Sequence, residues 1–215
     1  EMLYLMEAKS AAMEASRRLN LRLQEARIAA EEQAFTDILT GLKNRRALNA
    51  VLERLIAAGE GFAVMHIDLD YFKAVNDSLG HAAGDHVLQV VARIMVQETR
   101  SSDMVVRLGG DEFTVVLPDV RNEGMLRRIG QRIIDRLEEP IHFKGEVCKV
   151  SASIGTVWMQ RGDCRTRETV LANADAALYA SKHAGRARHT FYKAAMGEVA
   201  SIDTPAPGQE GACGS

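Results

Sequence analysis

Two short runs of strand-forming residues, separated by a pair of glycines, constrain the fold of this chain more than any other feature. Residues 104–106 are Met-Val-Val and residues 113–117 are Phe-Thr-Val-Val-Leu, with Gly109 and Gly110 between the two runs. Apolar, β-branched runs on either side of a glycine turn are typical of a β-hairpin. The stretch therefore predicts two adjacent antiparallel strands, at about 104–109 and 112–118.

Two carboxylates, Asp111 and Glu112, follow the glycine pair directly. A glycine has no side chain, so a bulky anion can approach its backbone closely, and it also permits a positive φ. Adjacent carboxylates suit a hard divalent cation such as Mg²⁺. The stretch indicates a metal–nucleotide site, although Gly and Asp are also common in turns that carry no chemistry.

Composition narrows the class of protein. The chain has 215 residues, enough for one domain with appendages; 47% are hydrophobic and 26% charged, as in soluble globular proteins. A formal net charge of −2 gives no sign of a nucleic-acid groove. Three scattered cysteines without a Cys-x-x-Cys pair argue against a disulfide framework and favour a reducing cytosol. We expect no membrane span and no signal peptide.

The N-terminal segment has the composition of a long helix. Residues 2–34 contain no Gly or Pro, and the chain begins inside this pattern, so we expect a fragment of a longer protein. Apolar residues recur near heptad spacing along this segment, but Arg22 interrupts the seam that they form, which predicts only a weak coiled coil. A solvated connector helix and a parallel dimer helix that carries a signal from an upstream domain both remain open. The near-heptad positions are Leu5, Ala8, Ala12, Ala15, Leu19 and Ala26.

The rest of the chain alternates between strand and helix patterns. The order β-α-β-β-α-β with additions predicts an α+β, ferredoxin-like domain, with a central antiparallel sheet and helices on one face. We expect a helix-dimer segment at 1–35, the globular domain at 36–193 and a disordered tail from about 194–196 to 215. Besides the hairpin, the predicted elements are helices at about 45–58 (capped by Asn44), 85–99, 121–138 and 168–184, and strands at 62–67, 148–158 and 189–192.

Further carboxylates follow the first strand. Asp68 and Asp70 come directly after Ile67, and carboxylates at the end of a strand are common metal ligands. If the strand continues only as far as one of them, the two point to opposite faces. We therefore expect one ligand there, assisted by a backbone carbonyl; a role in forming the turn is the alternative.

Other polar residues suit a nucleotide. An Asp such as Asp85 can accept hydrogen bonds from the N1–H and amino group of guanine, a donor pair that adenine lacks; the alternative is a cap of a helix that begins near His86. Lys182 and Arg186 are candidate phosphate clamps, or cations that complement a helix C-terminus. Arg100 can bind phosphate or guanine, or only pair with a nearby carboxylate on the surface.

Together these pieces resemble the GGDEF family of diguanylate cyclases over about residues 36–193. Several ordered motifs at consistent spacing carry the resemblance. They are Asp-x-Leu-Thr-Gly-Leu-x-Asn-Arg-Arg at 37–46, Asp-x-Asp-x-Phe-Lys-x-x-Asn-Asp at 68–77, Gly-His-x-x-Gly-Asp at 80–85, Arg-x-Gly-Gly-Asp-Glu-Phe at 107–113, Ser-x-Gly at 153–155 and Ala-Asp-x-Ala-Leu-Tyr-x-x-Lys-x-x-Gly-Arg at 174–186.

The resemblance implies synthesis of cyclic di-GMP from two GTP molecules with release of pyrophosphate. Each subunit of an antiparallel pair would hold one GTP, with two Mg²⁺ (or Mn²⁺) in each active site. It implies that Glu112 is either a further metal ligand or helps to deprotonate the attacking hydroxyl. The other implied roles are metal binding by Asp68, Asp111 and the Leu69 carbonyl, a catalytic contribution from Lys73, guanine binding by Asn76 and Asp85, phosphate binding by Phe72, Lys73, Lys182 and Arg186, and space for the nucleotide at Gly109 and Gly110.

Regulation and specificity are implied as well. Arg100 and Asp103 have the spacing of the family's inhibitory product site, which Arg128 or Arg132 would complete. The family usually has Asn where this chain has Ala187. A branch that makes mixed GMP–AMP dinucleotides carries Ser at the position of Asp85, so GTP alone is expected here.

The resemblance thus predicts an active, product-inhibited cyclase. We expect it to form a homodimer through the N-terminal helix and to respond to an upstream sensor, with neither a nucleic-acid polymer nor a membrane as a partner. A catalytically silent receptor or relay that binds GTP or cyclic di-GMP is the alternative.

Overall fold

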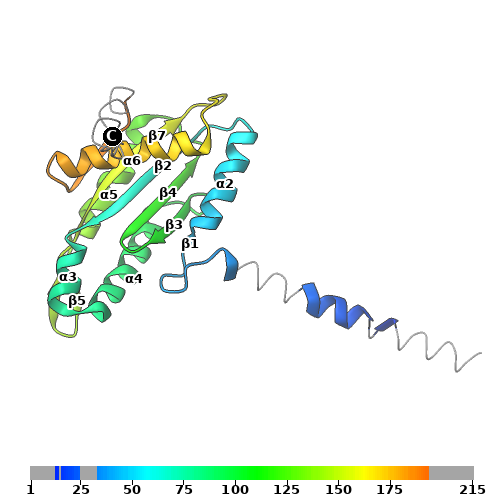
Figure 1. The fold of residues 1–215 in the computed structure, drawn as a ribbon, viewed down its shortest axis with the longest axis horizontal. Helices are drawn as coiled ribbons and strands as arrows, with labels where there is room; N and C mark the ends of the chain where they lie inside the picture. The colour runs from blue at the N-terminus through cyan, green and yellow to red at the C-terminus, as the bar shows by residue number, and fades with distance from the viewer. Residues whose placement is uncertain (1–12, 15, 25–32, 194–215) are drawn as a thin grey trace, which may run out of the picture.

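The computed structural model describes residues 13, 14, 16–24 and 33–193 (Figure 1). Residues 16–24 are helical, and Leu19, Leu21 and Leu23 are each more than half exposed. Of the predicted heptad positions up to Ala26, only Leu19 is described, so the coiled coil and its dimer stay predictions. The predicted tail likewise lies outside the described residues. No helix in the described part is long and apolar enough to cross a membrane.

The domain is built on a six-stranded sheet in the order β1-β3-β4-β2-β7-β8. The predicted hairpin is confirmed at the predicted residues. The four inner strands are antiparallel as expected, but each edge strand runs parallel to its neighbour, so the sheet is mixed. The connection from β7 to β8 is a crossover through a helix, which makes the two strands parallel. The strands are β1 (Lys43–Asn44), β2 (Phe62–Asp70), β3 (Met104–Gly109), β4 (Glu112–Pro118), β7 (Ser151–Met159) and β8 (Arg188–Phe191).

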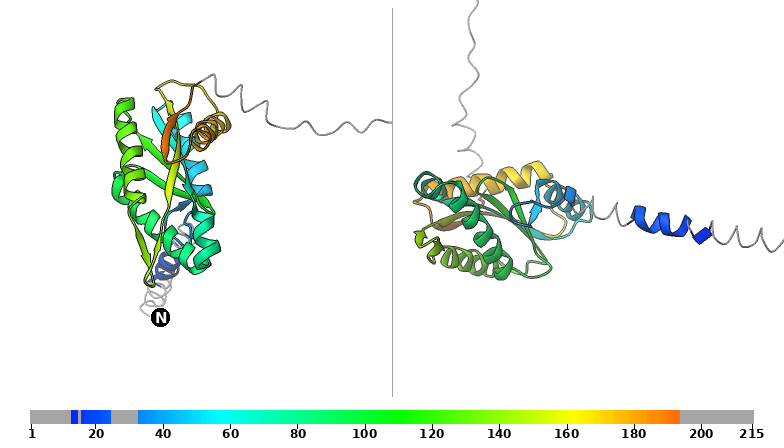
Figure 2. Two further views of the ribbon diagram at one scale, coloured as in Figure 1. Left: turned by 90° about the vertical axis from the view of Figure 1, so that its left-hand side faces the viewer. Right: turned by 90° about the horizontal axis from the view of Figure 1, so that it is seen from below.

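Helices cover both faces of the sheet, not one face as predicted (Figure 2). Helices α4 (His81–Glu98) and α5 (Glu123–Leu137) pack on one face, and α2 (Arg45–Ala57) and α6 (Arg167–His183) on the other. The physical reason for helices on both faces is visible in the burial of β2. Residues 62–65 of β2 are all buried, and a strand buried on both faces has a continuous apolar run without polar alternation.

Several elements differ from the predicted pattern. A short helix, α3 (Phe72–Leu79), follows β2, and a small hairpin of β5 (Ile141–Phe143) and β6 (Glu146–Cys148) precedes β7; neither was predicted. The helix expected at 85–99 begins earlier, at His81. Strand β2 continues three residues beyond its predicted end, and the strand expected at 148–158 is observed at 151–159.

Gly155 brings α6 into direct backbone contact with the sheet. A Cβ at this position would lie 2.1 Å from the Leu178 nitrogen and 2.3 Å from the Ala174 carbonyl oxygen. The Ser181 hydroxyl strengthens the contact by donating to the Ile154 carbonyl at 2.7 Å. The glycine of the Ser-x-Gly motif is therefore required by packing, because a larger residue would force α6 away from β7.

We predict that Gly155→Ala lowers the free energy of unfolding by about 2–3 kcal/mol, the cost typical of an overpacked core. Urea denaturation of the wild-type and variant domains measures the difference. Gly124→Ala is the matched control, because Gly124 lies on α5 where a Cβ would meet no atom closer than 3.3 Å; it should be neutral or raise stability by roughly 0.5 kcal/mol. Equal stability of the two variants would contradict the packing argument.

Candidate active site

Arg107 holds the glycine turn in place from inside the hairpin. Its Nε and Nη2 donate to the Gly110 carbonyl oxygen at 3.0 and 2.8 Å, while Nη1 lies 3.1 and 3.2 Å from the two oxygens of Asp37. Gly109 and Gly110 have φ values of 138° and 53°, which glycine adopts readily. The turn is thereby fixed and joined to the segment that precedes α2.

Asp37 is the acceptor that receives this arginine. The amide and hydroxyl of Thr40 donate to its Oδ1 at 2.9 and 2.6 Å. Burial alone would raise the pKa of Asp37, but the hydrogen bonds from Thr40 and Arg107 outweigh it and lower that pKa below its ordinary value. Asp37 is therefore an anion bound to Arg107 at neutral pH, and it ties residues 37–42 to the hairpin.

Three acidic residues, Asp68, Asp111 and Glu112, lie at neighbouring backbone positions where the hairpin meets the end of β2. Asp68 is paired with Glu112 across the two strands, and the Leu69 amide donates to the Asp111 carbonyl at 3.3 Å. Burial raises the pKa of Asp68, and the charges of Asp111 and Asp70 raise it further, whereas Lys182 acts in the opposite direction. Asp68 is therefore a carboxylate whose charge its surroundings do not fully neutralise.

Asp70 lies beside this group, but its carboxylate already accepts hydrogen bonds from neighbouring residues. Because β2 continues through Asp70, it points to the same face as Asp68, and the expectation of opposite faces is wrong. Its carboxylate is buried and accepts hydrogen bonds at 3.0 Å from the Ser153 hydroxyl and the Ala187 amide. Asp70 is thus held by neighbouring groups, and the expected single metal ligand, Asp68, stays a prediction.

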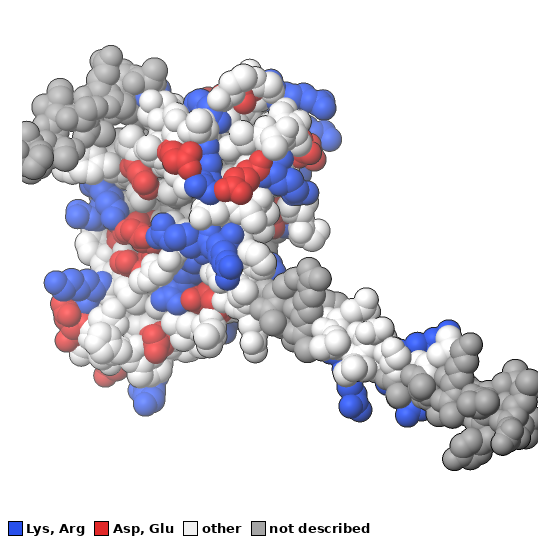
Figure 3. Space-filling view, turned by 45° about the vertical axis from the view of Figure 1, so that its right-hand side comes forward, with Lys and Arg blue, Asp and Glu red and all other residues white. Residues whose placement is uncertain are grey.

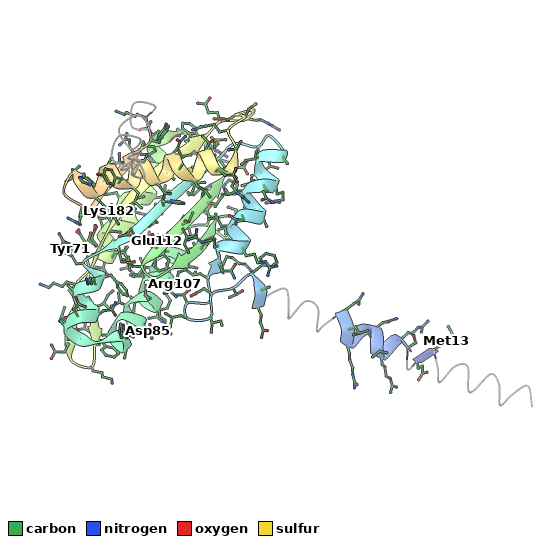
Figure 4. The ribbon with its side chains drawn as sticks, in the orientation of Figure 1. Met13, Tyr71, Asp85, Arg107, Glu112 and Lys182 are labelled. Carbon is green, nitrogen blue, oxygen red and sulfur yellow. The ribbon has the colours of Figure 1, made fainter. Side chains whose placement is uncertain are left out.

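Two of the predicted phosphate clamps lie next to these carboxylates. Lys182 Nζ, from the last turn of α6, is 2.8 Å from Asp68 Oδ2, and Arg186 Nε is 3.7 Å from Asp70 Oδ1. Figure 4 shows Lys182, Glu112 and Tyr71 around the same end of the sheet. On the face drawn in Figure 3, acidic and basic side chains are interspersed and form no broad patch of one sign.

The α3–α4 pair presents the other predicted residues. Phe72 is buried in the core, so only its backbone is available to a nucleotide, while Lys73 is exposed. Asn76 packs against Gly84 so closely that a Cβ on Gly84 would lie 2.0 Å from Asn76 Oδ1. Asp85 is exposed within α4, whose N-cap is Gly80, so it does not cap this helix.

The predicted product-site residues divide into two groups. The Arg100 amide donates to Asp103 Oδ2 at 2.8 Å, and the Arg100 side chain is exposed. Arg132 Nε and Nη2 each lie 2.8 Å from oxygens of Glu98, two residues before Arg100 in the chain. Arg128 instead lines a cavity on the β8 side of α5. The structure thus holds Arg132 next to the helix end that leads into the Arg100 turn.

The residues at the hairpin suit a hard cation. No group of three or more His, Cys, Asp or Glu side chains that could hold a metal ion occurs in the described part of the chain. Mg²⁺ in phosphoryl-transfer sites, however, is bound by one or two carboxylates plus substrate phosphates and water. Asp68 and Asp111, with the Leu69 carbonyl, match that donor set.

One polar contact beside this site has no counterpart among the residues predicted from the sequence. His66 lies on β2, and its Nδ1 is 2.5 Å from Asp175 Oδ1 on α6. Both residues line a cavity of about 180 Å³ that Glu112 also borders. A histidine within an otherwise apolar strand run was the only sequence signal. The contact fixes α6 on β2 close to the point where Lys182 reaches Asp68.

Comparison with known proteins identifies the chain's relatives. The family model "Diguanylate cyclase, GGDEF domain" matches residues 34–188. The chain is 43% identical over 166 residues to the probable diguanylate cyclase DgcE of Escherichia coli and 38% identical over 166 residues to the diguanylate cyclase DgcP of Pseudomonas aeruginosa. These matches cover 74% and 73% of this chain but only 15% and 24% of the relatives, so the chain spans less than a quarter of their length.

Solved structures extend the comparison to the fold. The coiled coil and GGDEF domain of DgcB from Caulobacter crescentus, solved with cyclic di-GMP, superposes with a TM-score of 0.77 at 28% identity, covering 85% of this chain and 98% of that one. The GGDEF domain of YfiN from Pseudomonas aeruginosa gives a TM-score of 0.72 at 35% identity, covering 77% and 99%. With the motifs, the six-stranded fold and the family match in agreement, this chain belongs to the GGDEF diguanylate cyclase domain family.

Proposed function

We propose that this domain condenses two GTP molecules into cyclic di-GMP and releases two pyrophosphates. The observation that carries the proposal is the position of Asp68 at the hairpin, paired with Glu112 across β2 and β4 and with the cation of Lys182 2.8 Å from its carboxylate. A carboxylate pair next to a cationic clamp suits a metal-bound triphosphate. The relatives named as diguanylate cyclases, DgcE and DgcP, support the same reaction.

The residues of the chain would divide the work of phosphoryl transfer. Asp68, Asp111 and the Leu69 carbonyl would hold Mg²⁺, which when bound neutralises phosphate charge and orients the leaving group. Lys182 and Arg186 would move from their carboxylate partners to the phosphates. The first amides of α3, which have no acceptor within that helix, would donate to phosphate oxygens.

Guanine selection would come from the α3–α4 pair. Asn76 and Asp85 supply an amide and a carboxylate, and Asp85 is exposed and not engaged in capping. A carboxylate can accept from both the N1–H and the amino group of guanine. Because the chain has Asp85 and not Ser, we propose that GTP is the only substrate.

The reaction requires two copies of the domain. The 3′-hydroxyl of each GTP would attack the α-phosphate of the other, so two sites must face each other. We propose that the segment at 1–35 holds the pair together and that the globular domain spans 36–193. Glu112 is exposed at the hairpin and would act as a further metal ligand or assist deprotonation of the hydroxyl.

Product inhibition would act at the turn between α4 and β3. We propose that cyclic di-GMP binds Arg100 and Asp103, with Arg132 as the third residue. Arg132 is favoured over Arg128 because its guanidinium is held at Glu98, next to the Arg100 turn. The exposed Arg100 side chain has its guanidinium available for a phosphate or a guanine edge.

Incubation of the purified chain with GTP and Mg²⁺, followed by chromatography of the nucleotides, tests the reaction. We expect cyclic di-GMP to appear faster than linearly with protein concentration, because two copies must meet. Glu112→Gln should lower the rate by on the order of a hundredfold or more if Glu112 assists proton transfer. Bound but unconverted GTP in the wild-type protein would instead identify the domain as a silent receptor.

Mg²⁺ binding is tested separately from catalysis. Asp111→Asn removes a charge that raises the pKa of Asp68. A raised carboxyl pKa disfavours the folded protein at neutral pH, and this cost decreases as the pH falls through the folded-state pKa. Without Mg²⁺ at pH 7, we therefore expect the variant to be more stable, by roughly 0.5 kcal/mol. Thermal unfolding should also show that Mg²⁺ with GTP stabilises the wild type more than the variant; the reverse order would contradict the metal assignment.

The packing of Asn76 provides a test of guanine binding. Gly84→Ala should displace the Asn76 side chain, because the new Cβ would overlap it. We expect GTP affinity to fall about tenfold, the equivalent of losing one hydrogen bond, as measured by titration calorimetry. Ala82→Gly, on the exposed surface of the same helix, is the control for helix propensity. Unchanged GTP affinity in Gly84→Ala would argue against Asn76 as a guanine contact.

A further inference from the structure

A second group of cations lies away from the catalytic carboxylates, between α5 and β8. A cavity of about 460 Å³ is lined by Arg127, Arg128, Gln131, Ala187, Arg188 and His189. Figure 2 shows β8 at the edge of the sheet beside α5. The lining thus contains three guanidinium groups and no carboxylate.

The existing contacts leave this cavity electropositive. Arg127 is paired with Glu123 and lies 4.6 Å from the centre of the Phe191 ring. Arg188 Nε donates to the Arg186 carbonyl at 3.0 Å, a neutral acceptor that leaves its charge uncompensated. Neither Arg128 nor Arg188 forms an ion pair with a carboxylate among the described residues.

His189 forms part of the cavity wall and adds no charge to it. Burial, and secondly the charge of Arg127, lower its pKa to about 4, so the ring is neutral at physiological pH. Its Nε2 is 2.6 Å from the Thr156 hydroxyl, and its Nδ1 is buried with no hydrogen-bond partner in the described structure. Gly130 allows the ring to pack against α5, since a Cβ there would lie 2.3 Å from Nδ1.

We infer that this cavity is a binding site for a ligand that carries a di- or triphosphate chain, distinct from the substrate site. Guanidinium groups bind phosphate oxygens in a bidentate manner, and three of them on one wall match a compact chain of negative charge. The amide of Gln131 can donate to a further oxygen. Inorganic polyphosphate and a nucleoside polyphosphate share this chemistry.

The loop at 185–188 connects this cavity with the proposed substrate clamps. Gly185, Arg186 and Ala187 have φ values of 114°, 63° and 46°, three successive residues in the left-handed region. The Ala187 amide donates to Asp70 on one side of the loop, while Ala187 and Arg188 line the cavity on the other. A ligand in the cavity would therefore stabilise the loop that carries Arg186. Because Arg186 is a proposed phosphate clamp, this stabilisation would also affect GTP conversion. That effect rests on the proposed function, whereas the binding site itself does not.

Titration calorimetry with inorganic tripolyphosphate, in EDTA to prevent metal-dependent binding, tests the site without any turnover. We expect the full chain to bind, and the double variant Arg128→Ala/Arg188→Ala to bind at least tenfold more weakly. Arg93→Ala/Arg161→Ala removes the same charge from two exposed positions outside the cavity and should bind like the wild type. Thermal unfolding verifies that each variant is folded. If Arg128→Ala/Arg188→Ala is not folded, Arg128→Lys/Arg188→Lys is used in its place.

Two further variants separate this site from the others. Lys182→Ala and Arg100→Ala should retain tripolyphosphate binding, because neither residue lines the cavity. Titration with ATP in place of tripolyphosphate shows which kind of ligand the site takes. Tighter binding of ATP assigns a nucleoside triphosphate, and equal binding of the two assigns the phosphate chain alone. Wild-type affinity in Arg128→Ala/Arg188→Ala, or binding lost only in Lys182→Ala, would overturn the inference even if the domain proves to be an active cyclase.

Discussion

The hairpin end of this domain depends on one guanidinium group, that of Arg107. It accommodates two acceptors that lie far apart in the chain, the Gly110 carbonyl at 2.8–3.0 Å and the Asp37 carboxylate at 3.1–3.2 Å. The first contact fixes the conformation of the glycine turn, and the second fixes the segment before α2 against it. A lysine could not satisfy both, because only the planar fork presents donors in these directions. The position of Asp111 therefore follows from an interaction in which Asp111 takes no part.

Strand β2 places polar side chains next to this fixed turn. Alternation directs Met65, Ile67 and Leu69 into one core, while His66 and Asp68 face α6 on the other side of the sheet. Charges on that face are costly to bury, and burial accordingly raises the pKa of Asp68. The domain thus retains an unfavourable carboxylate at the point where a cation and phosphates would neutralise it, a compromise typical of functional sites.

The parts of this fold that could be predicted from sequence are those with a local cause. The hairpin was predicted at its observed residues because the glycine pair and the flanking apolar runs specify it without long-range contacts. Helix α3 was not predicted because it has only eight residues and begins after Tyr71. The φ of 68° at Tyr71 follows from no pattern in the sequence. The Arg107 contact joins residues 70 positions apart. Motif spacing could therefore mark Asp37 and Arg107 as members of two motifs, but it could not show that this arginine links the two.

The loop after α6 shows how one backbone segment can serve two groups of charges. Ala187 has a left-handed conformation that costs an L-residue about 1–2 kcal/mol, and the family's usual Asn would adopt it at lower cost. The conformation persists because the Ala187 amide donates to Asp70, which the Ser153 hydroxyl also holds in place. Its direction places Arg186 on the carboxylate side and Arg188 on the cavity side. A strained conformation persists only where its surroundings hold it, so a ligand that binds Arg186 on one side of the loop or Arg188 on the other would change the conformational equilibrium of the loop. The proposed cavity ligand would thereby be coupled to the proposed substrate clamps.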